Sequence, residues 1–331
     1  MPRDFSPKDR KLTNIKMSNQ PTQLKTIFRA GIKRGWRSFI WINKIFIPIS
    51  LLVTLLQWTG WLNYLHFLLN PLMSLINLPP EAALPIISAM TINLYAGIAA
   101  MTAIPFTPAQ MTLIAVFTLI CHNLIIEGII QHQSGLNIVK TTLIRTGAAT
   151  ITVLIISRFL GDTSQSLAVT AGLTAQPPLL EALKEWAVNS LVLLLKILGI
   201  VMTIMTILQF YESLNWTRYW LKIFRPLMKV LRLSDRVATL WTTSVVFGLM
   251  YGGAVIIDEA KKGTLTKEEL EPLHISVGIN HSMVEDPTLF TLLGLNPFWL
   301  WIPKLLMAIV AVQAYRTVTY LNHRLRHQSL G

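Results

Sequence analysis

Apolar residues along the chain gather into eight long stretches separated by shorter polar segments. Four stretches lie in each half of the sequence: 39–60, 83–104, 110–131, 142–160, 187–210, 237–257, 273–294 and 297–315. Each is close to the roughly 20 residues that a helix needs to cross a hydrocarbon layer about 30 Å thick. The pattern therefore predicts an all-α polytopic membrane protein. We expect the first stretch to be an uncleaved span, because no small-residue cleavage site follows it.

The second half repeats features of the first in the same order. Lys44 and Gln57 recur as Lys196 and Gln209 at an offset of 152. Three further matches follow at offsets of 155, 156 and 158: Pro71-Leu72-Met73 with Pro226-Leu227-Met228, Tyr95-Ala96-Gly97 with Tyr251-Gly252-Gly253, and His122-Asn123 plus Glu127 with Asn280-His281 plus Glu285. A slowly drifting offset indicates duplication followed by small insertions. We predict two repeats, 38–160 and 186–315, joined by an external linker at 161–185.

Basic residues predict that the two repeats are inverted in the membrane. The segment 61–81 carries no Lys or Arg, whereas its counterpart carries five at spacings of three and four: Arg218, Lys222, Arg225, Lys229 and Arg232. Such a basic helix face, opposite an aromatic and aliphatic one, is typical of a helix lying on an anionic inner leaflet. An inverted repeat must cross the membrane an odd number of times. We therefore expect three crossings and one re-entrant hairpin in each repeat.

The stretches 83–104 and 237–257 are the best candidates for the re-entrant hairpins. Each has a Tyr-x-Gly sequence near its middle: Tyr95 with Gly97, and Tyr251 with Gly253. Glycine permits the tight backbone of a hairpin tip, although close packing between helices explains these glycines equally well. This topology puts 24 of the 29 Lys and Arg inside and only Arg158 and Lys184 outside. It predicts an inner-membrane protein with a basic cytoplasmic arm or interfacial helix at 1–37 and a cytoplasmic tail at 316–331.

Composition supports a bilayer as the solvent and narrows the function. Of the 331 residues, 52% are hydrophobic and 14% are charged, against about 25% charged in soluble domains. The net charge of +13 lies in bands between apolar stretches, which argues against a nucleic-acid partner. The single cysteine, Cys121, excludes an internal disulfide and a cysteine-based metal site. With no phosphate-binding loop and no catalytic arrangement, we expect neither an enzyme nor a cofactor beyond a coupling cation or proton.

Two polar clusters occupy matching places in the repeats and are the main candidates for chemistry. They consist of His122, Asn123 and Glu127 in the first repeat, and of Asn280, His281, Ser282, Glu285 and Asp286 in the second. On continuous helices His281 and Glu285 would share a face, and so would Asn123 and Glu127. Ionisable residues within a membrane are costly and point to function. These groups suit a proton, a cation or a polar solute, whereas a structural network is the alternative.

Two further points concern the chemistry of the clusters. Imidazole with carboxylate is a plausible metal ligand set, but no spacing here is diagnostic, so we assign no metal ligands from the sequence. Lys196 lies about ten residues inside its stretch. Its positive charge could neutralise a carboxylate of the clusters or attract an anionic solute. An equal alternative is that the side chain extends to the membrane interface.

At the two clusters the chain resembles the nucleoside-recognition, or Gate, domain family, which includes spore maturation membrane proteins. Related Gate domains occur in concentrative nucleoside transporters and in the membrane part of the ferrous-iron transporter. The resemblance covers about 38–315 and rests on four motifs: His122-Asn123 with Glu127-Gly128, Tyr251-Gly252-Gly253-Ala254, Asn280-His281-Ser282 and Glu285-Asp286. It implies an inner-membrane protein with inverted Gate repeats and re-entrant hairpins.

We therefore expect a secondary transporter for a small polar solute, nucleoside-like or an organic ion, with a midplane site between the repeats. Two alternatives stay open. One is a divalent-cation permease that uses His122, His281, Glu285 and Asp286. The other is a non-transporting scaffold or accessory subunit whose clusters only join helices. Expected partners are the solute or ion, anionic inner-leaflet lipids and further copies of the chain.

Overall fold

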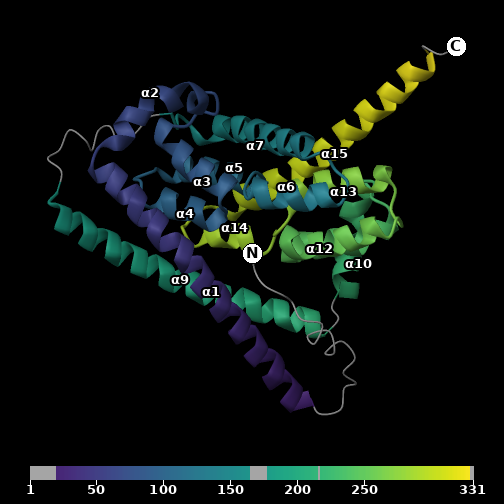
Figure 1. Ribbon diagram of the computed structural model, residues 1–331, viewed down its shortest axis with the longest axis horizontal. Helices are drawn as coiled ribbons and strands as arrows, with labels where there is room; N and C mark the ends of the chain where they lie inside the picture. The colour runs from purple at the N-terminus through teal and green to yellow at the C-terminus, as the bar shows by residue number, and fades with distance from the viewer. Residues whose placement is uncertain (1–19, 165–176, 215–216, 329–331) are drawn as a thin grey trace.

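The computed structural model describes residues 20–164, 177–214 and 217–328, which form helices and turns without a strand. In the first half these are α1 (Gln20–Trp58), α2 (Trp61–Ser74), η2 (Pro80–Ala82), α3 (Ala83–Thr91), α4 (Leu94–Thr102), α5 (Pro108–Ile120), α6 (Leu124–Gln133) and α7 (Ile138–Leu160). In the second half they are α9 (Leu179–Ser213), α10 (Thr217–Val230), η3 (Asp235–Val237), α11 (Ala238–Phe247), α12 (Leu249–Lys261), α13 (Lys267–Asn280), α14 (Glu285–Thr291) and α15 (Pro297–Gln328) (Figure 1).

Five helical segments of the described residues are long and apolar enough to cross a membrane. They are Leu24–Trp58, Pro108–Gln133, Ile138–Leu160, Leu179–Ser213 and Pro297–Asn322. Each overlaps one of the apolar stretches of the sequence, and the predicted all-α polytopic membrane fold is confirmed. The predicted crossing at 273–294 is not among them, because α13 begins in a charged segment and the chain leaves the helix after Asn280.

The elements follow one another in the same order in the two halves. A long helix, a short helix and a 3₁₀ turn lead into a helix pair, an interrupted helix and a second long helix. Even the helix starts correspond. Thr107 and Gln110 form a capping box at the start of α5, and Thr266 and Glu269, 159 residues later, do the same for α13. Matching caps fix the start of the two helices at equivalent residues.

Outside the membrane-spanning segments, Glu269 also joins the start of α13 to η3. Its carboxylate accepts hydrogen bonds from the backbone N–H of Thr266 (3.1 Å) and from the hydroxyl of Ser234 (2.8 Å). Because both donors favour the ionised form, the pKa of Glu269 lies below its ordinary value. The charged cap therefore anchors the helix that carries His281 at its far end.

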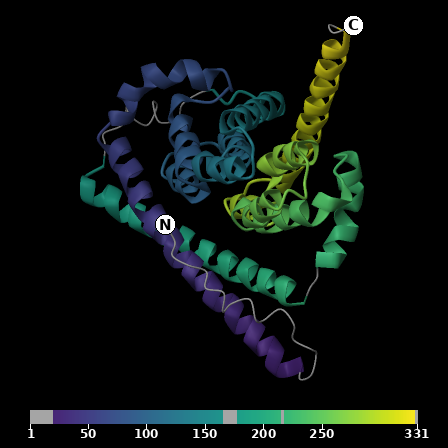
Figure 2. The same cartoon turned by 45° about the vertical axis from the view of Figure 1, so that its right-hand side comes forward.

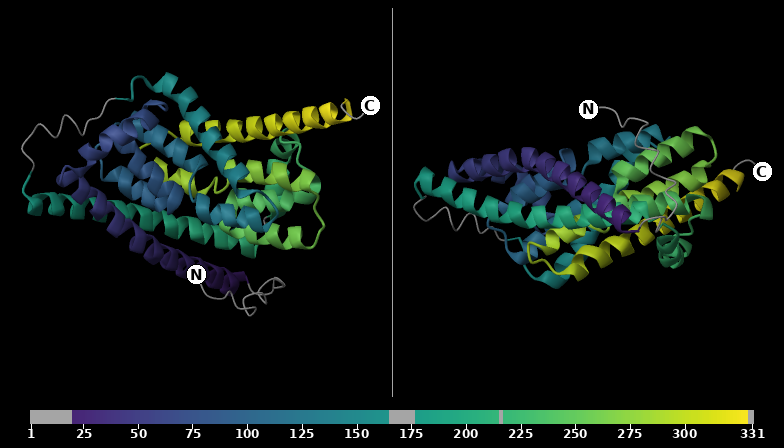
Figure 3. Two further views of the ribbon diagram at one scale, coloured as in Figure 1. Left: turned by 45° about the horizontal axis from the view of Figure 1, so that its top comes forward. Right: turned by 90° about the horizontal axis from the view of Figure 1, so that it is seen from below.

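The first helices of the two halves, α1 and α9, run antiparallel and cross each other (Figures 1 and 3). Near the start of α1, Arg34 pairs with Glu212 at the end of α9, at 3.0 Å. At the other end, the indole of Trp58 donates to the carbonyl of Pro177 (3.0 Å), just before α9 begins. The crossing pair lies along one side of the remaining helices (Figure 2).

Two glycines let α1 and α9 approach closely. A Cβ added to Gly31 would lie 2.7 Å from the Cα of Thr206, and one added to Gly35 would lie 2.7 Å from the sulfur of Met202. Small residues four apart are a common way for membrane helices to bring their backbones together. The long helices of the two halves therefore pack as a fixed pair.

The last helices, α7 and α15, also run antiparallel. Lys140 near the start of α7 lies 4.7 Å from the ring centre of Tyr315, far along α15. Phe159 at the end of α7 packs against Trp299 at the start of α15, with ring centres 6.0 Å apart. Helices at equivalent places in the two halves thus run in opposite directions, as a two-fold relation between the halves would produce.

The two candidate stretches fold as helix pairs, but the predicted positions of their turns are wrong. Within 83–104 the helix pair α3–α4 turns at Ile92 and Asn93, where the Asn93 side chain accepts from the N–H of Ala96 (3.0 Å) and caps α4. Within 237–257 the pair α11–α12 turns at Gly248, which has a φ of 84°. The Tyr95/Gly97 and Tyr251/Gly253 sequences lie inside the second helix of each pair. The glycines serve packing, because a Cβ on Gly97 would lie 2.7 Å from that of Ala89.

The boundaries of the arm, linker and tail also differ from the prediction. Residues 1–19 and 165–176 lie outside the described part, and α1 runs from Gln20 without a break into the first span. α9 already begins at Leu179, inside the predicted linker, and α15 extends to Gln328 in the predicted tail. The helix propensity of the residues does not by itself end a helix at a membrane surface. Helices α9 and α15 therefore continue past their apolar segments.

The glycine packing within the α3–α4 hairpin is testable. Gly97→Ala should lower the unfolding temperature in detergent, because the new methyl meets Ala89 and the carbonyl oxygen of Pro85 at 3.0 Å. Overpacking of this kind costs about 1–3 kcal/mol. Gly147→Ala in α7, where a Cβ meets nothing within 4 Å, is the control and should stabilise slightly. Unfolding is monitored by tryptophan fluorescence on heating. An equal rise of the unfolding temperature in both variants would contradict this packing.

Candidate functional site

Two helices are interrupted in the middle of the molecule, and the interruptions meet. α5 ends at Ile120 and α6 begins at Leu124, near the centre of the span Pro108–Gln133. In the second half the chain leaves the helix between Asn280 and Glu285. The predicted continuous helices through the two clusters are therefore wrong, and the cluster residues lie at or beside unwound backbone.

The unwound segments share a strained backbone conformation. Asn123 has a φ of 54° and Ser282, 159 residues later, has a φ of 50°. Left-handed conformations cost non-glycine residues about 1–2 kcal/mol, and asparagine tolerates them best. Strain at equivalent places in both halves indicates that the two interruptions serve the same purpose.

The hairpins supply backbone partners for the interruptions. The N–H of Asn123 donates to the carbonyl of Ala89 in α3 (2.8 Å), and the N–H of Met283 donates to the carbonyl of Val245 in α11 (2.8 Å). Backbone groups away from water need such partners. Each hairpin is thereby bonded to the interruption in its own half.

Two histidines form the centre of the site. His122 and His281 are 5% and 1% exposed, and their Nε2 atoms lie 3.1 Å apart. Each Nδ1 is bonded to a carbonyl oxygen of the preceding turn, that of Thr118 at 2.8 Å and that of Val277 at 3.0 Å. A carbonyl oxygen only accepts, so each Nδ1 carries a hydrogen, and in its neutral form each ring presents the lone pair of Nε2. The two lone pairs are brought together at the contact between the halves.

Two carboxylates complete the cluster. Oε1 of Glu127 lies 3.0 Å from Nε2 of His281 and 3.8 Å from that of His122. Oδ2 of Asp286 lies 3.5 Å from Nε2 of His122. The residues are 2% and 7% exposed, respectively. The ligand atoms of His122, Glu127 and His281 all lie within 4.8 Å of one another, and Asp286 joins this group through His122. We call these four residues the His-carboxylate cluster (His122, Glu127, His281 and Asp286).

Arg145 of α7 joins this cluster to the end of α5. Its Nη1 donates to Oε2 of Glu127 (2.6 Å), and its Nε and Nη2 donate to the carbonyls of Ile120 (3.1 Å) and His122 (2.9 Å). Carbonyls at a helix end lack intrahelical partners. The guanidinium therefore satisfies the interrupted backbone and balances a buried carboxylate at the same time.

Lys304 of α15 has the equivalent place in the second half. It is 1% exposed, and its Nζ donates to the carbonyl of His281 (2.9 Å). Arg145 and Lys304 are 159 residues apart, as are His122 and His281. Sequence reasoning missed both basic residues, since it counted Arg145 only among the inside charges and assigned no role to Lys304. Their shared offset with the histidines is the signal that identifies them.

The structure also corrects the pairing of the acidic residues. The same offset matches Glu127 with Asp286, and not with Glu285 as the sequence comparison predicted. Glu285 instead accepts a hydrogen bond from the hydroxyl of Tyr95 in α4 (2.6 Å). Its counterpart in the first half is Ile126, so the Tyr95–Glu285 bond has no equivalent there. The side chain of Tyr251 lies outside the described part of the chain.

The remaining predicted residues take different places. Asn280 is fully buried beside His281, and neither polar atom of its side chain has a hydrogen-bond partner among the described residues. Gly97 and Gly253 lie at helix contacts, with Gly253 against Ile130 of α6. Lys196 is exposed on α9 and does not join the cluster. Exposure on a long membrane helix favours the snorkelling explanation for this lysine.

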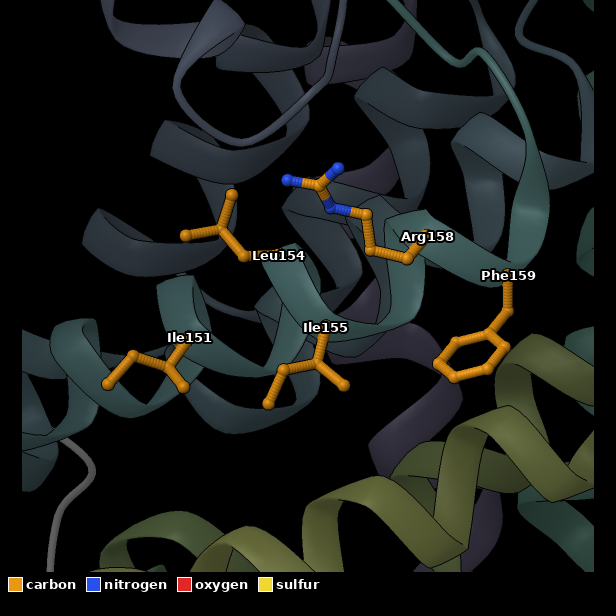
Figure 4. Close-up of a pocket in the computed structure, with 5 residues that line it drawn as sticks. All are labelled: Ile151, Leu154, Ile155, Arg158 and Phe159. Atoms are coloured by element: carbon orange, nitrogen blue, oxygen red, sulfur yellow. The ribbon is translucent and has the colours of Figure 1, made fainter.

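A shallow groove on the outer face of α7 has a different character. It is lined by Ile151, Leu154, Ile155, Arg158 and Phe159 (Figure 4). Ile155 and Phe159 are 54% and 70% exposed. An exposed apolar face on a membrane helix suits contact with lipid chains. The buried polar cluster is therefore the better candidate for a solute site.

Comparisons with known proteins identify relatives of the chain. The sequence model of the Gate family, described as "Nucleoside recognition", matches residues 39–175. The "Uncharacterized membrane protein YvoD" of Bacillus subtilis (strain 168) is 30% identical over 289 residues, which cover 86% of this chain and 91% of the relative. No solved structure matches the chain.

The buried ion pair predicts a measurable contribution to stability. Glu127→Gln removes the charge opposite Arg145 within a site where both side chains are at most 3% exposed. Loss of one partner of a buried pair costs about 3–5 kcal/mol, so chemical or thermal unfolding in detergent should shift clearly. Asp258→Asn, which removes the partner of Lys262 in an exposed pair, is the control and should leave the transition unchanged. If Glu127→Gln unfolds at the same temperature or denaturant concentration as the unmodified protein, the ion pair does not contribute this stability.

Proposed function

Because the chain belongs to the Gate, or nucleoside-recognition, family of membrane proteins, we propose that it is a secondary transporter for a small polar solute. The observation that carries the proposal is the meeting of two interrupted helices around buried ionisable groups, near the middle of a candidate span. Transporters bind substrate where unwound backbone and half-helices line a site near the midplane. Binding and release, with no chemical conversion, are what such a site offers.

The proposed orientation of the halves follows from the same arrangement. Equivalent helices run antiparallel, in support of two copies that are inverted in the membrane. Together with the distribution of basic residues, this favours cytoplasmic ends for the chain and residence in the inner membrane. The exposed basic side chains of α10, such as Lys222 and Arg225, suit anionic lipids on that side. Assembly into a homo-oligomer belongs to the same proposal.

The hairpins are the proposed moving parts. Each is tied to an interruption by backbone bonds, from Asn123 to Ala89 in one half and from Ser282 to Ser244 and Met283 to Val245 in the other. If the halves are inverted, movement of one hairpin away from the unwound segment of its own half exposes the cluster to only one side of the membrane. Alternating separation of the two hairpins then gives alternating access to a fixed site.

A membrane scaffold is the second candidate, and one observation favours it. Glu127 is 2% exposed and is enclosed by Arg145 and His281. A fully satisfied buried network also holds membrane helices together without any transport. The two functions differ in a property that can be measured, namely movement of a solute.

Transport by the purified protein tests the proposal. In proteoliposomes, addition of nucleosides, organic anions or divalent cations one at a time should produce uptake of at least one class. Asp286→Asn should abolish that uptake, because it removes a charge at the centre of the site. Glu181→Gln, at an exposed position in α9, should retain it at an equal amount of reconstituted protein. Absence of uptake for every class, with folded protein in the vesicles, would favour the scaffold.

A further inference from the structure

The His-carboxylate cluster has the composition and geometry of a metal site. We propose that His122, His281, Glu127 and Asp286 bind a divalent first-row transition metal ion, such as Zn²⁺, Fe²⁺ or Co²⁺. This inference rests on the proposed transport function and names the class of its cargo. It also assigns the role of ligand to Asp286, and removes Glu285 from the ligand set that the sequence suggested.

The first argument is the character of the converging atoms. Both Nδ1 atoms are bonded to backbone carbonyls, at 2.8 and 3.0 Å, so each neutral ring directs a lone pair from Nε2. Oε1 of Glu127 and Oδ2 of Asp286 are acceptors as well. With neutral rings, His122, His281 and Glu127 therefore direct three acceptor atoms toward one another, and Asp286 adds a fourth beside His122. Acceptors repel one another unless a cation lies between them, and histidine with carboxylate is a ligand set typical of such cations.

The second argument is distance. Bonds of about 2.0–2.2 Å to nitrogen and oxygen in a tetrahedral zinc site place the ligand atoms about 3.3–3.6 Å from one another. Within the cluster the corresponding separations are 3.1 Å between the two Nε2 atoms, 3.0 and 3.8 Å from Glu127 to His281 and His122, and 3.5 Å from Asp286 to His122. The values lie on both sides of the tetrahedral distance. The ligand atoms of His122, His281 and Glu127 all lie within 4.8 Å of one another. Asp286 lies beside His122 but outside that group, so its side chain must move toward Glu127 and His281 to complete the coordination.

The third argument is the support around the ligands. Metal-bound histidines commonly donate their other ring N–H to a carbonyl or carboxylate, which fixes the ring. Both histidines do this here. Glu127 uses Oε2 for Arg145 and keeps Oε1 for the centre. Oδ2 of Asp286 is buried and has no hydrogen-bond partner among the described residues, which leaves it available as a ligand.

The ligand types select the class of metal. Imidazole nitrogen suits zinc, iron, cobalt and nickel, whereas calcium and magnesium take six or more oxygen ligands. The cluster offers two nitrogens and two carboxylates, so a transition metal fits better than a hard cation. No thiolate is contributed, since Cys121 lies against Thr146 (3.5 Å) and outside the cluster.

The surrounding charges favour an ion that exchanges over one held permanently. Arg145 pairs with Glu127, and the buried Lys304 adds a second positive charge that formally offsets the carboxylate of Asp286. A divalent ion therefore adds positive charge to a neutral site and is bound less tightly than in a site with carboxylates alone. Transport requires binding that is strong enough for entry and weak enough for release.

A spectroscopic titration of the full-length protein in detergent tests the site. With any affinity tag removed, Co²⁺ should bind one ion per chain and give the visible absorption of tetrahedral coordination, and Zn²⁺ should displace it. Asp286→Asn should raise the dissociation constant for Co²⁺ by about tenfold or more, as loss of a metal-site group does. His281→Gln should remove the absorption.

Glu285→Gln provides the matched control. It removes a buried carboxylate one residue from Asp286 but leaves the four ligands in place, and its amide oxygen still accepts from Tyr95. Cobalt affinity should therefore stay within about twofold of the unmodified protein. Unchanged affinity in Asp286→Asn, or no saturable cobalt signal in the unmodified protein, would overturn the proposal.

The outcomes also separate this inference from the transport proposal. Uptake of an organic solute by protein without a cobalt signal would refute the metal site and leave transport standing. A cobalt signal in protein that moves neither metal nor solute would support the site and refute transport. ⁶⁵Zn²⁺ uptake that Asp286→Asn abolishes and Glu181→Gln retains would support both.

Discussion

An interrupted helix inside a membrane leaves backbone N–H and C=O groups that no water reaches, and the structure is organised around that constraint. The hairpins provide carbonyls for the N–H groups after each interruption. Arg145 and Lys304 reach the carbonyls of His122 and His281 from the last helix of each half. Each interruption therefore exists only because two other elements of the same half support it. The cost of strained backbone at Asn123 and Ser282 is offset by those bonds.

The contact between the halves follows from their relation. His122 and His281 occupy equivalent positions, and they touch each other. In a two-fold arrangement, an element that contacts its own copy lies on the axis. The antiparallel pairs α1 with α9 and α7 with α15 fit the same axis. One histidine and one carboxylate from each half thus contribute to a cluster that neither half contains alone.

The sequence predicted the larger features well because they depend on local pattern. Apolar length identified the membrane helices, and repeated motifs pointed to the two segments whose polar residues meet in the structure. Details that depend on tertiary contacts were missed. Asn93 and Gly248 turn the hairpins, but Tyr95 and Gly97 looked like better breakers. A helix interrupted at His122 cannot be inferred from an unbroken apolar stretch, since its bonds come from α3 and α7.

The error in the acidic pairing has a structural cause. The order His-Asn in one half and Asn-His in the other invites an alignment that is shifted by one residue, and that shift pairs Glu127 with Glu285. Function at the centre depends on where the side chains lie, so the correct partner is the residue that reaches His122, which is Asp286. Glu285 then becomes a feature of one half only. Its carboxylate accepts from Tyr95, which lies in the hairpin of the other half. Tyr95 therefore links the α3–α4 hairpin to the second half by a bond that Ile126, at the position equivalent to Glu285, cannot accept.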